Sequence, residues 1–228
     1  PGNKGNGHLY TNDKVFGIQI GNNANARSND GSVSGIAIGD YSQSRALGIG
    51  LGHYAQSEQI GAIAVGSASK PKGFNSLSML REGFAGEQYA EAIGKSSSAQ
   101  GKASLAMGHS ALATGNQSIA IGSANPDPLT DAKGTPYTAY DEKTNTQANA
   151  DRAIAIGQGA KSNTDDSIAM GTGANVVAGK NYKGENFTHG IAIGSNALSQ
   201  GIQGVAIGNR AAHYRDNAVA IGNNAKTY

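Results

Sequence analysis

An alternation of aliphatic and small residues recurs along the chain at short intervals. Its unit reads aliphatic, Ala, aliphatic, Gly, as in Ile119-Ala120-Ile121-Gly122. A period-two alternation of this kind predicts a short β-strand, and the glycine after it predicts a turn. The glycines that close the copies are Gly21, Gly39, Gly52, Gly66, Gly94, Gly108, Gly122, Gly157, Gly171, Gly194, Gly208 and Gly222.

The spacing of these glycines predicts a coil of about thirteen turns. Most intervals are fourteen residues, and the interval from Gly66 to Gly94 is twice fourteen. A degenerate copy, Leu77-Ser78-Met79-Leu80, falls at its midpoint, with Leu80 in the place of glycine. A second stretch of small residues in each repeat, such as Ala111-Leu112-Ala113, predicts the returning strand of the turn.

Three longer intervals, of 18, 35 and 23 residues, predict inserted loops. These insertions fall near residues 22–34, 126–150 and 175–188. The coil is therefore expected to span residues 17–228, after an N-terminal tip or cap formed by residues 1–16.

The middle residue of the strand repeat predicts a packing surface. We expect the two aliphatic residues to face the interior of the coil and the residue between them to face outward. That residue is small and apolar in ten of the thirteen turns, whereas a solvated face would accept Lys, Glu or Thr. We therefore expect it to pack against another copy of the chain. The predicted packing residues are Ala37, Ala64, Ala106, Ala120, Ala155, Ala169, Ala192, Ala206 and Ala220.

Composition supports a thin core and excludes several kinds of function. Hydrophobic residues make up 38% of the 228 residues and aromatic residues 6%, too little bulky material for a thick globular core. The net charge of +2 is scattered, so no nucleic-acid partner is expected. Without cysteine there are no disulfides, thiol catalysis or cysteine metal sites. No apolar run is long enough to span a membrane, so no direct membrane contact is expected.

No catalytic, cofactor or metal site is predicted, and the chain is not expected to be an enzyme. His53 and His109 both follow a repeat glycine, but four turns place them ~19 Å apart, too far to share a metal. The glycines of residues 48–52 are explained by the repeat. Left-handed β-helix acyltransferases need about eighteen residues for a turn, so the fourteen-residue period argues against that class of enzyme.

The recurring motif of Ser118-Ile119-Ala120-Ile121-Gly122 resembles the head repeat of trimeric autotransporter adhesins, the YadA-like heads. The resemblance implies an all-β, left-handed parallel β-roll, assembled as a homotrimer. It implies display on the surface of a Gram-negative bacterium, with a stalk and an outer-membrane anchor that are absent from this stretch.

The resemblance also implies a host protein as partner. Such heads bind extracellular-matrix glycoproteins (collagen, fibronectin, laminin) or adhesion receptors of the immunoglobulin superfamily. The alternative is a structural or self-associating head that serves autoaggregation and biofilm, without a dedicated host receptor.

The insertions are the predicted ligand-binding regions, because loops on a rigid scaffold commonly carry function. The longest holds Tyr137 and Tyr140, and the last holds Tyr182, Lys183 and Phe187. Tyrosine offers a large contact area at low entropic cost. The other interpretation is that the insertions cap or brace the trimer.

One segment keeps the fourteen-residue spacing but carries large side chains, namely Phe74, Leu80, Phe84 and Tyr89. They are expected either to fill a small satellite core or to form an exposed apolar patch.

Overall fold

The computed structural model describes residues 17–26, 35–130, 136–141, 144–181 and 183–228. The predicted N-terminal tip, residues 1–16, lies outside these ranges. The chain divides into two compact units, residues 1–106 and 107–228, with the division inside β12 (Leu105–Met107). The described residues contain no α-helix, and therefore no helix that could cross a membrane.

The first unit is a parallel coil with two kinds of strand. The three-residue strands pair with one another in register, so that Ile18 lies opposite Ile36 and Ile63 opposite Leu77. They are β1 (Ile18–Ile20), β3 (Ile36–Ile38), β5 (Ile49–Leu51), β6 (Ile63–Val65), β8 (Leu77–Met79) and β10 (Glu91–Ile93). The two-residue strands return the chain: β2 (Asn25–Ala26), β4 (Gln43–Ser44), β7 (Lys70–Pro71), β9 (Phe84–Ala85) and β11 (Ser98–Ala99).

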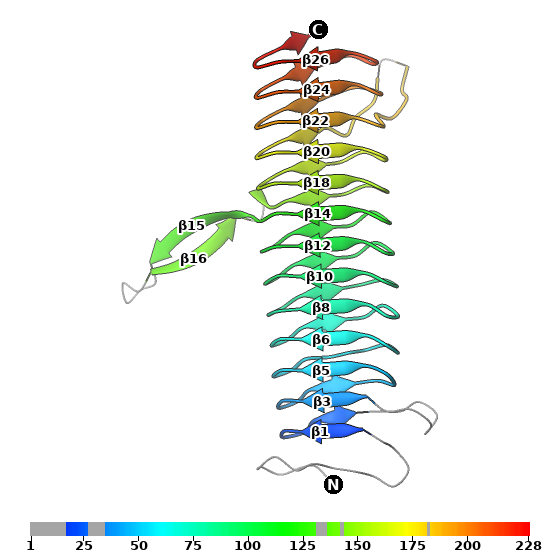
Figure 1. Cartoon of the computed structure of the whole chain (residues 1–228), viewed down its shortest axis with the longest axis vertical. Helices are drawn as coiled ribbons and strands as arrows, with labels where there is room; N and C mark the ends of the chain where they lie inside the picture. Colours follow the sequence, from blue (N-terminus) through cyan, green and yellow to red (C-terminus); the bar gives the residue numbers. More distant parts are fainter. Residues whose placement is uncertain (1–16, 27–34, 131–135, 142–143, 182) are drawn as a thin grey trace. The chain divides into compact units, whose positions relative to one another are not determined.

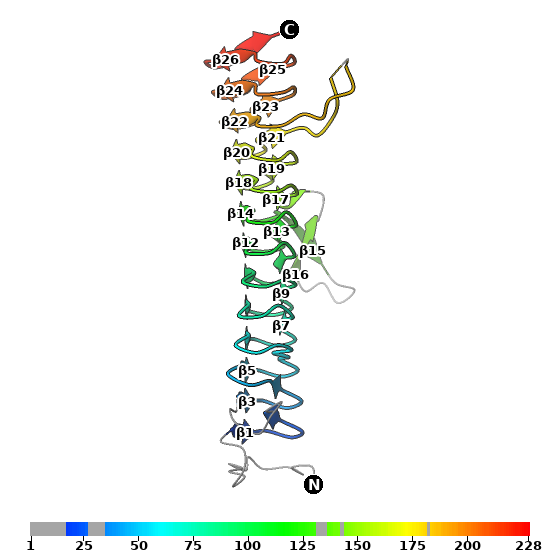
Figure 2. The ribbon, with the colours of Figure 1, turned by 90° about the vertical axis from the view of Figure 1, so that its right-hand side faces the viewer.

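The second unit repeats this arrangement, and Figure 1 shows its three-residue strands one above the next. They are β14 (Ile119–Ile121), β18 (Ile154–Ile156), β20 (Ile168–Met170), β22 (Ile191–Ile193), β24 (Val205–Ile207) and β26 (Val219–Ile221). The returning strands form a second parallel sheet: β13 (Leu112–Ala113), β17 (Gln147–Ala148), β19 (Lys161–Ser162), β21 (Asn175–Val176), β23 (Leu198–Ser199), β25 (Ala212–His213) and β27 (Lys226–Thr227). Turned by 90°, the ribbon shows the two sheets of this unit as separate columns (Figure 2).

The described residues hold thirteen three-residue strands, so the predicted number of turns is confirmed. The degenerate turn is among them, because β8 pairs in register with both β6 and β10. Leu80 takes the glycine position there with a φ of 73°, and its side chain is 54% exposed. The left-handed winding stays a prediction.

The predicted direction of the strand side chains is wrong. In β14 and β24 the middle alanine is fully buried, whereas the aliphatic residues on either side are half-buried or exposed. All nine predicted packing alanines lie inside their own chain and cannot contact another copy. Ala37, Ala64, Ala106, Ala120, Ala155, Ala169, Ala192 and Ala206 are 0% exposed, and Ala220 is 2% exposed.

The width of the coil explains the reversal. A fourteen-residue turn brings its two short strands so close that only small side chains fit between them, and the interior is almost entirely Ala and Ser. Ala111 and Ala113, three and five residues after a repeat glycine, are also fully buried. Isoleucine is too large for this interior, so the β-branched residues that favour the strand lie on its outer face.

The repeat glycines are required by the stacking of the turns. Gly208 has a φ of +131°, which side chains rarely adopt, and a Cβ there would lie 2.4 Å from the carbonyl oxygen of Gly222. The backbone N–H of Gly222 donates to the carbonyl oxygen of Ile207 at 2.8 Å, joining the two turns. Any side chain at position 208 would force these turns apart.

Two of the insertions lie within the described residues, and each contains fewer residues than predicted. The longest contains an antiparallel hairpin of β15 (Asn125–Thr130) and β16 (Pro136–Asp141), and the coil resumes by β17. The last insertion begins only after β21, which pairs within the returning sheet. We call residues 177–188 the arm. The insertion predicted near residues 22–34 falls largely on residues 27–34, outside the described ranges.

Candidate functional site

The arm is a short, internally bonded hairpin that carries two of the predicted binding residues, Lys183 and Phe187. Lys180 and Asn186 form an antiparallel bridge at its base. At its tip the Oδ1 atom of Asn181 accepts the backbone N–H groups of Lys183 and Glu185, each at 3.0 Å. A side chain amide that satisfies two backbone donors fixes the turn locally.

The third predicted residue of this insertion, Tyr182, lies outside the described residues. Phe187 is placed by two contacts with Gly179. Its backbone N–H donates to the carbonyl oxygen of Gly179 at 2.8 Å, and its ring lies over that glycine. A Cβ at Gly179 would come within 2.7 Å of the ring, so the glycine makes room for it.

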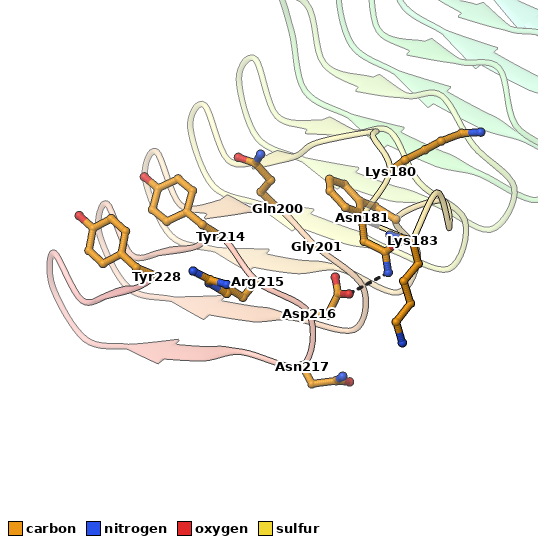
Figure 3. A pocket seen from close by; sticks show the side chains of 11 residues that line it. Lys180, Asn181, Lys183, Gln200, Gly201, Tyr214, Arg215, Asp216, Asn217 and Tyr228 are labelled. Carbon is orange, nitrogen blue, oxygen red and sulfur yellow. Dashed lines mark hydrogen bonds between the residues drawn. The ribbon is translucent and has the colours of Figure 1, made fainter.

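At its base the arm is joined to the coil by backbone hydrogen bonds, from the N–H of Val177 to the carbonyl oxygen of Ser199 and from the N–H of Gln203 to that of Thr188. A side-chain contact holds its tip. The Nδ2 group of Asn181 donates to Oδ2 of Asp216 at 3.0 Å, across 35 residues of sequence (Figure 3). The other carboxylate oxygen of Asp216 accepts the backbone N–H of Ile202 at 2.8 Å. The pKa of Asp216 is lowered, first by the Ile202 N–H, then by Asn181, with a smaller contribution from the charge of Lys183. The fastening carboxylate therefore stays ionised.

The arm and the coil line an open pocket of about 650 Å³, a volume in the usual range for small-ligand sites. Its lining is mostly polar, with three cationic side chains and three aromatic rings. The residues are Lys180, Asn181, Lys183, Phe187, Gln200, Gly201, Tyr214, Arg215, Asp216, Asn217 and Tyr228.

The coil side of the pocket presents an aromatic pair beside a cation. The rings of Tyr214 and Tyr228 stack with centroids 5.4 Å apart and planes 13° from parallel. Arg215 is exposed next to Tyr214, and Figure 3 shows its side chain between the two tyrosines and Asp216. Lys180, in the same view, points away from the tyrosine pair.

The prediction from the insertions found only one side of this pocket. Lys183 and Phe187 come together on the arm, whereas Tyr214, Arg215 and Asp216 belong to an ordinary turn of the coil and were missed. The available signal was Tyr214 itself, a large aromatic residue fourteen positions after Gln200 in an otherwise regular repeat.

The other predicted tyrosines lie on the hairpin. Tyr137 and Tyr140 are residues of β16, where they pair with Leu129 and Pro126 of β15. Their place in ligand binding stays a prediction.

The first unit carries a separate set of exposed aromatic residues. Tyr41 and Tyr54 stack with centroids 4.8 Å apart, and the ring of His53 packs edge-on against Tyr54. Farther along, Phe74 and Tyr89 are 40% and 55% exposed. With Leu80 also exposed, the expectation of a satellite core is wrong for these three residues, and the exposed apolar patch stays a prediction.

Phe84 differs from these three. It is half-buried on β9, with the Nζ group of Lys72 at 5.6 Å from its ring centroid. Within the described part of the chain, no group of three or more His, Asp or Glu residues is placed to hold a metal ion.

The YadA head domain repeat matches residues 99–125, 144–174, 188–211 and 215–228 of this chain. Among solved structures, the collagen-binding domain of the Yersinia adhesin YadA is similar, with 24% sequence identity and a TM-score of 0.41. The match covers 70% of this chain and 65% of that structure, so the chain spans less than two thirds of its length. A search of curated proteins gives no match.

Proposed function

Starting from a chain that carries YadA head domain repeats, we propose that it is the head of a bacterial surface adhesin. In this proposal the head binds a host extracellular-matrix glycoprotein or a cell-adhesion receptor of the immunoglobulin superfamily. Its place is the surface of a Gram-negative cell, anchored in the outer membrane through a region beyond this stretch.

The observation that carries the proposal is the pocket between the arm and the coil. The interior of the coil is filled by alanine and serine, so a ligand has to bind outside it. The arm departs from the repeat and places Lys183 and Phe187 opposite Tyr214 and Arg215 of the coil. Exposed aromatic and cationic groups in a hollow are typical of recognition surfaces, and a binding role accounts for them better than catalysis.

The proposed head is a homotrimer. Its copies pack through the outer face of the three-residue strands, because the alanines predicted for this role are buried inside their own chain. That face carries two unbroken columns of aliphatic residues in the second unit. Met170 and Ile207 of one column are 40% and 36% exposed in the single chain, and Val219 of the other is 55% exposed. Columns of this kind form an apolar surface that copies of the chain would cover.

Two variants test the host-binding proposal. Deleting residues 179–187 shortens the interval from Gly171 to Gly194 to fourteen residues and preserves the coil register. We expect this variant to keep its β-structure by circular dichroism and to lose affinity for the host protein that the full chain binds. The screen compares collagen, fibronectin, laminin and immunoglobulin-superfamily ectodomains by biolayer interferometry.

A second variant, shortened in the hairpin between β15 and β16, tests the other predicted binding insertion, and Arg210→Gln, on the coil outside the pocket, is the control. Equal binding by the full chain and by the arm-deleted chain would remove the arm pocket from the proposal. Binding to none of these proteins, together with aggregation of cells that display the chain, would favour the self-associating head instead.

A further inference from the structure

We infer that the arm pocket binds an anionic sugar, a sulfated or uronic-acid residue of a glycan chain. The inference rests on the proposed function, because it names the ligand class for the same site. Three features of the pocket carry it: its cations, its aromatic rings and the backbone donors of the coil wall that are already bonded.

The guanidinium of Arg215 is available to bind an anionic group of a ligand. The single carboxylate in the lining, Asp216, already accepts hydrogen bonds from Ile202 and Asn181. Among the described residues, no carboxylate lies within salt-bridge distance of Arg215. An exposed guanidinium can bind a carboxylate or sulfate group through two parallel hydrogen bonds. Lys183 contributes a second positive charge from the arm side.

The aromatic rings add flat apolar surfaces beside these charges. Tyr214 and Tyr228 are 38% and 78% exposed, and Phe187 faces the pocket from the arm. A sugar ring has C–H faces that pack on aromatic faces and hydroxyl groups that need hydrogen-bond partners. Gln200 and Asn217 supply amide groups in the same lining. Aromatic faces, amides and cations together match a charged sugar better than a simple inorganic anion.

Three backbone donors of the coil wall are already bonded within the chain. The backbone N–H groups of Gln200 and Tyr214 donate to the carbonyl oxygens of His213 and Thr227, each at 3.1 Å. The backbone N–H of Ile202 donates to the carboxylate of Asp216. An extended peptide gains much of its affinity by hydrogen bonding to a free sheet edge. Since these three donors are already used, they are closed to a peptide backbone, which favours recognition through side chains.

The test uses the full chain and four probes of matched length in isothermal titration calorimetry. They are a heparin hexasaccharide, a hyaluronan hexasaccharide, maltohexaose and a hexaglutamate peptide. The first carries sulfates, the second only carboxylates, the third no charge, and the fourth the same kind of anion on a peptide. We expect one or both anionic sugars to bind at least about tenfold more tightly than maltohexaose and hexaglutamate.

Matched variants locate the binding. Arg215→Gln and Lys183→Gln should each weaken the anionic sugar about tenfold, because each removes a charge-assisted hydrogen bond. Tyr214→Leu should weaken it without changing the charge. Arg210→Gln is the control, since it removes one exposed positive charge of the same unit outside the pocket. Equal losses in Arg210→Gln and Arg215→Gln would show diffuse attraction and overturn the inference.

Two further results separate this inference from the proposed function. Hexaglutamate binding as tight as that of the sugars would make the pocket an acidic-peptide site and overturn the ligand class. If no sugar binds while a matrix protein still needs the arm, the ligand class is wrong and the adhesin proposal stands. If the sugars bind at the pocket but no host protein does, the inference stands and the proposed function fails.

Discussion

At the scale of single residues, the largest side chain in the interior is the least expected one. His213 is fully buried in a coil that elsewhere admits mainly Ala and Ser. Its Nε2 atom lies 2.6 Å from the hydroxyl of Ser199, and its Nδ1 atom 3.3 Å from the carbonyl oxygen of Arg215. Gly204 makes the space, since a Cβ there would lie 1.9 Å from the imidazole ring. Gly190 makes room for Val176 in the same way.

His213 should make stability depend on pH. Burial lowers its pKa below the ordinary value of 6.5, partly offset by hydrogen bonds with backbone groups of Arg215 and Gly204. Below pH 6.5 the unfolded chain takes up a proton that the folded chain does not, so stability falls as the pH drops from 6.5 toward the folded pKa. Urea unfolding at pH 7.5 and 5.5 measures the change. Between these two pH values the free energy of unfolding should fall more for the natural chain than for His213→Ser. Equal losses would mean that His213 accepts a proton without cost.

The pairing of Gly204 with His213 predicts a coupled pair of substitutions. Gly204→Ala should destabilise the chain by about 2 kcal/mol, because the added methyl group overlaps the imidazole ring. The same substitution in a His213→Ser background should be close to neutral, since other turns accept a side chain at the corresponding position, such as Ser167. A double-mutant cycle from urea midpoints measures the coupling, and additive effects would contradict the assignment.

At the scale of the strand and its turn, the repeat glycine should be far less tolerant than Leu80. Gly208→Ala forces a side chain into a φ near +131° and against the next turn, so we expect a loss of about 2 kcal/mol or more. Leu80 already adopts a left-handed φ of 73° with an exposed side chain, so Leu80→Ala should change stability by less than about 0.5 kcal/mol. Thermal unfolding of both variants provides the comparison. Similar losses would show that the two positions are equivalent.

Asn181 should hold the tip of the arm in place. Asn181→Ala removes its bonds to the carboxylates of Asp216 and Glu185 and the two bonds to the backbone of Lys183 and Glu185. We expect faster hydrogen exchange at the amides of the arm and an unchanged melting temperature of the coil. Asn186→Ala, an exposed residue of the same arm, is the matched control. Unchanged exchange in the Asn181 variant would mean that other contacts hold the arm.

The repeat could be predicted from the sequence because its period can be counted even where a turn lacks the usual residues. The fourteen-residue period located even the turn that ends in Leu80. Alternation defines two faces of a strand but not which is internal, and here the narrow interior decided for alanine over isoleucine. The predicted insertions were too long because the returning strands Gln147–Ala148 and Asn175–Val176 have no distinctive sequence pattern. Half of the pocket was missed because Asn181 meets Asp216 across 35 residues, which no local pattern encodes.

At the scale of the whole molecule, the outward aliphatic columns predict how copies associate. We expect a trimer in light scattering that Ile207→Asp dissociates, because the carboxylate would be buried in the proposed interface. Leu198→Asp, on the returning sheet, is the control and should leave the trimer intact. Ala206→Asp should instead abolish the β-sheet signal, since Ala206 lies inside its own coil with no room for a carboxylate. A trimer that survives Ile207→Asp but not Leu198→Asp would move the interface to the other sheet.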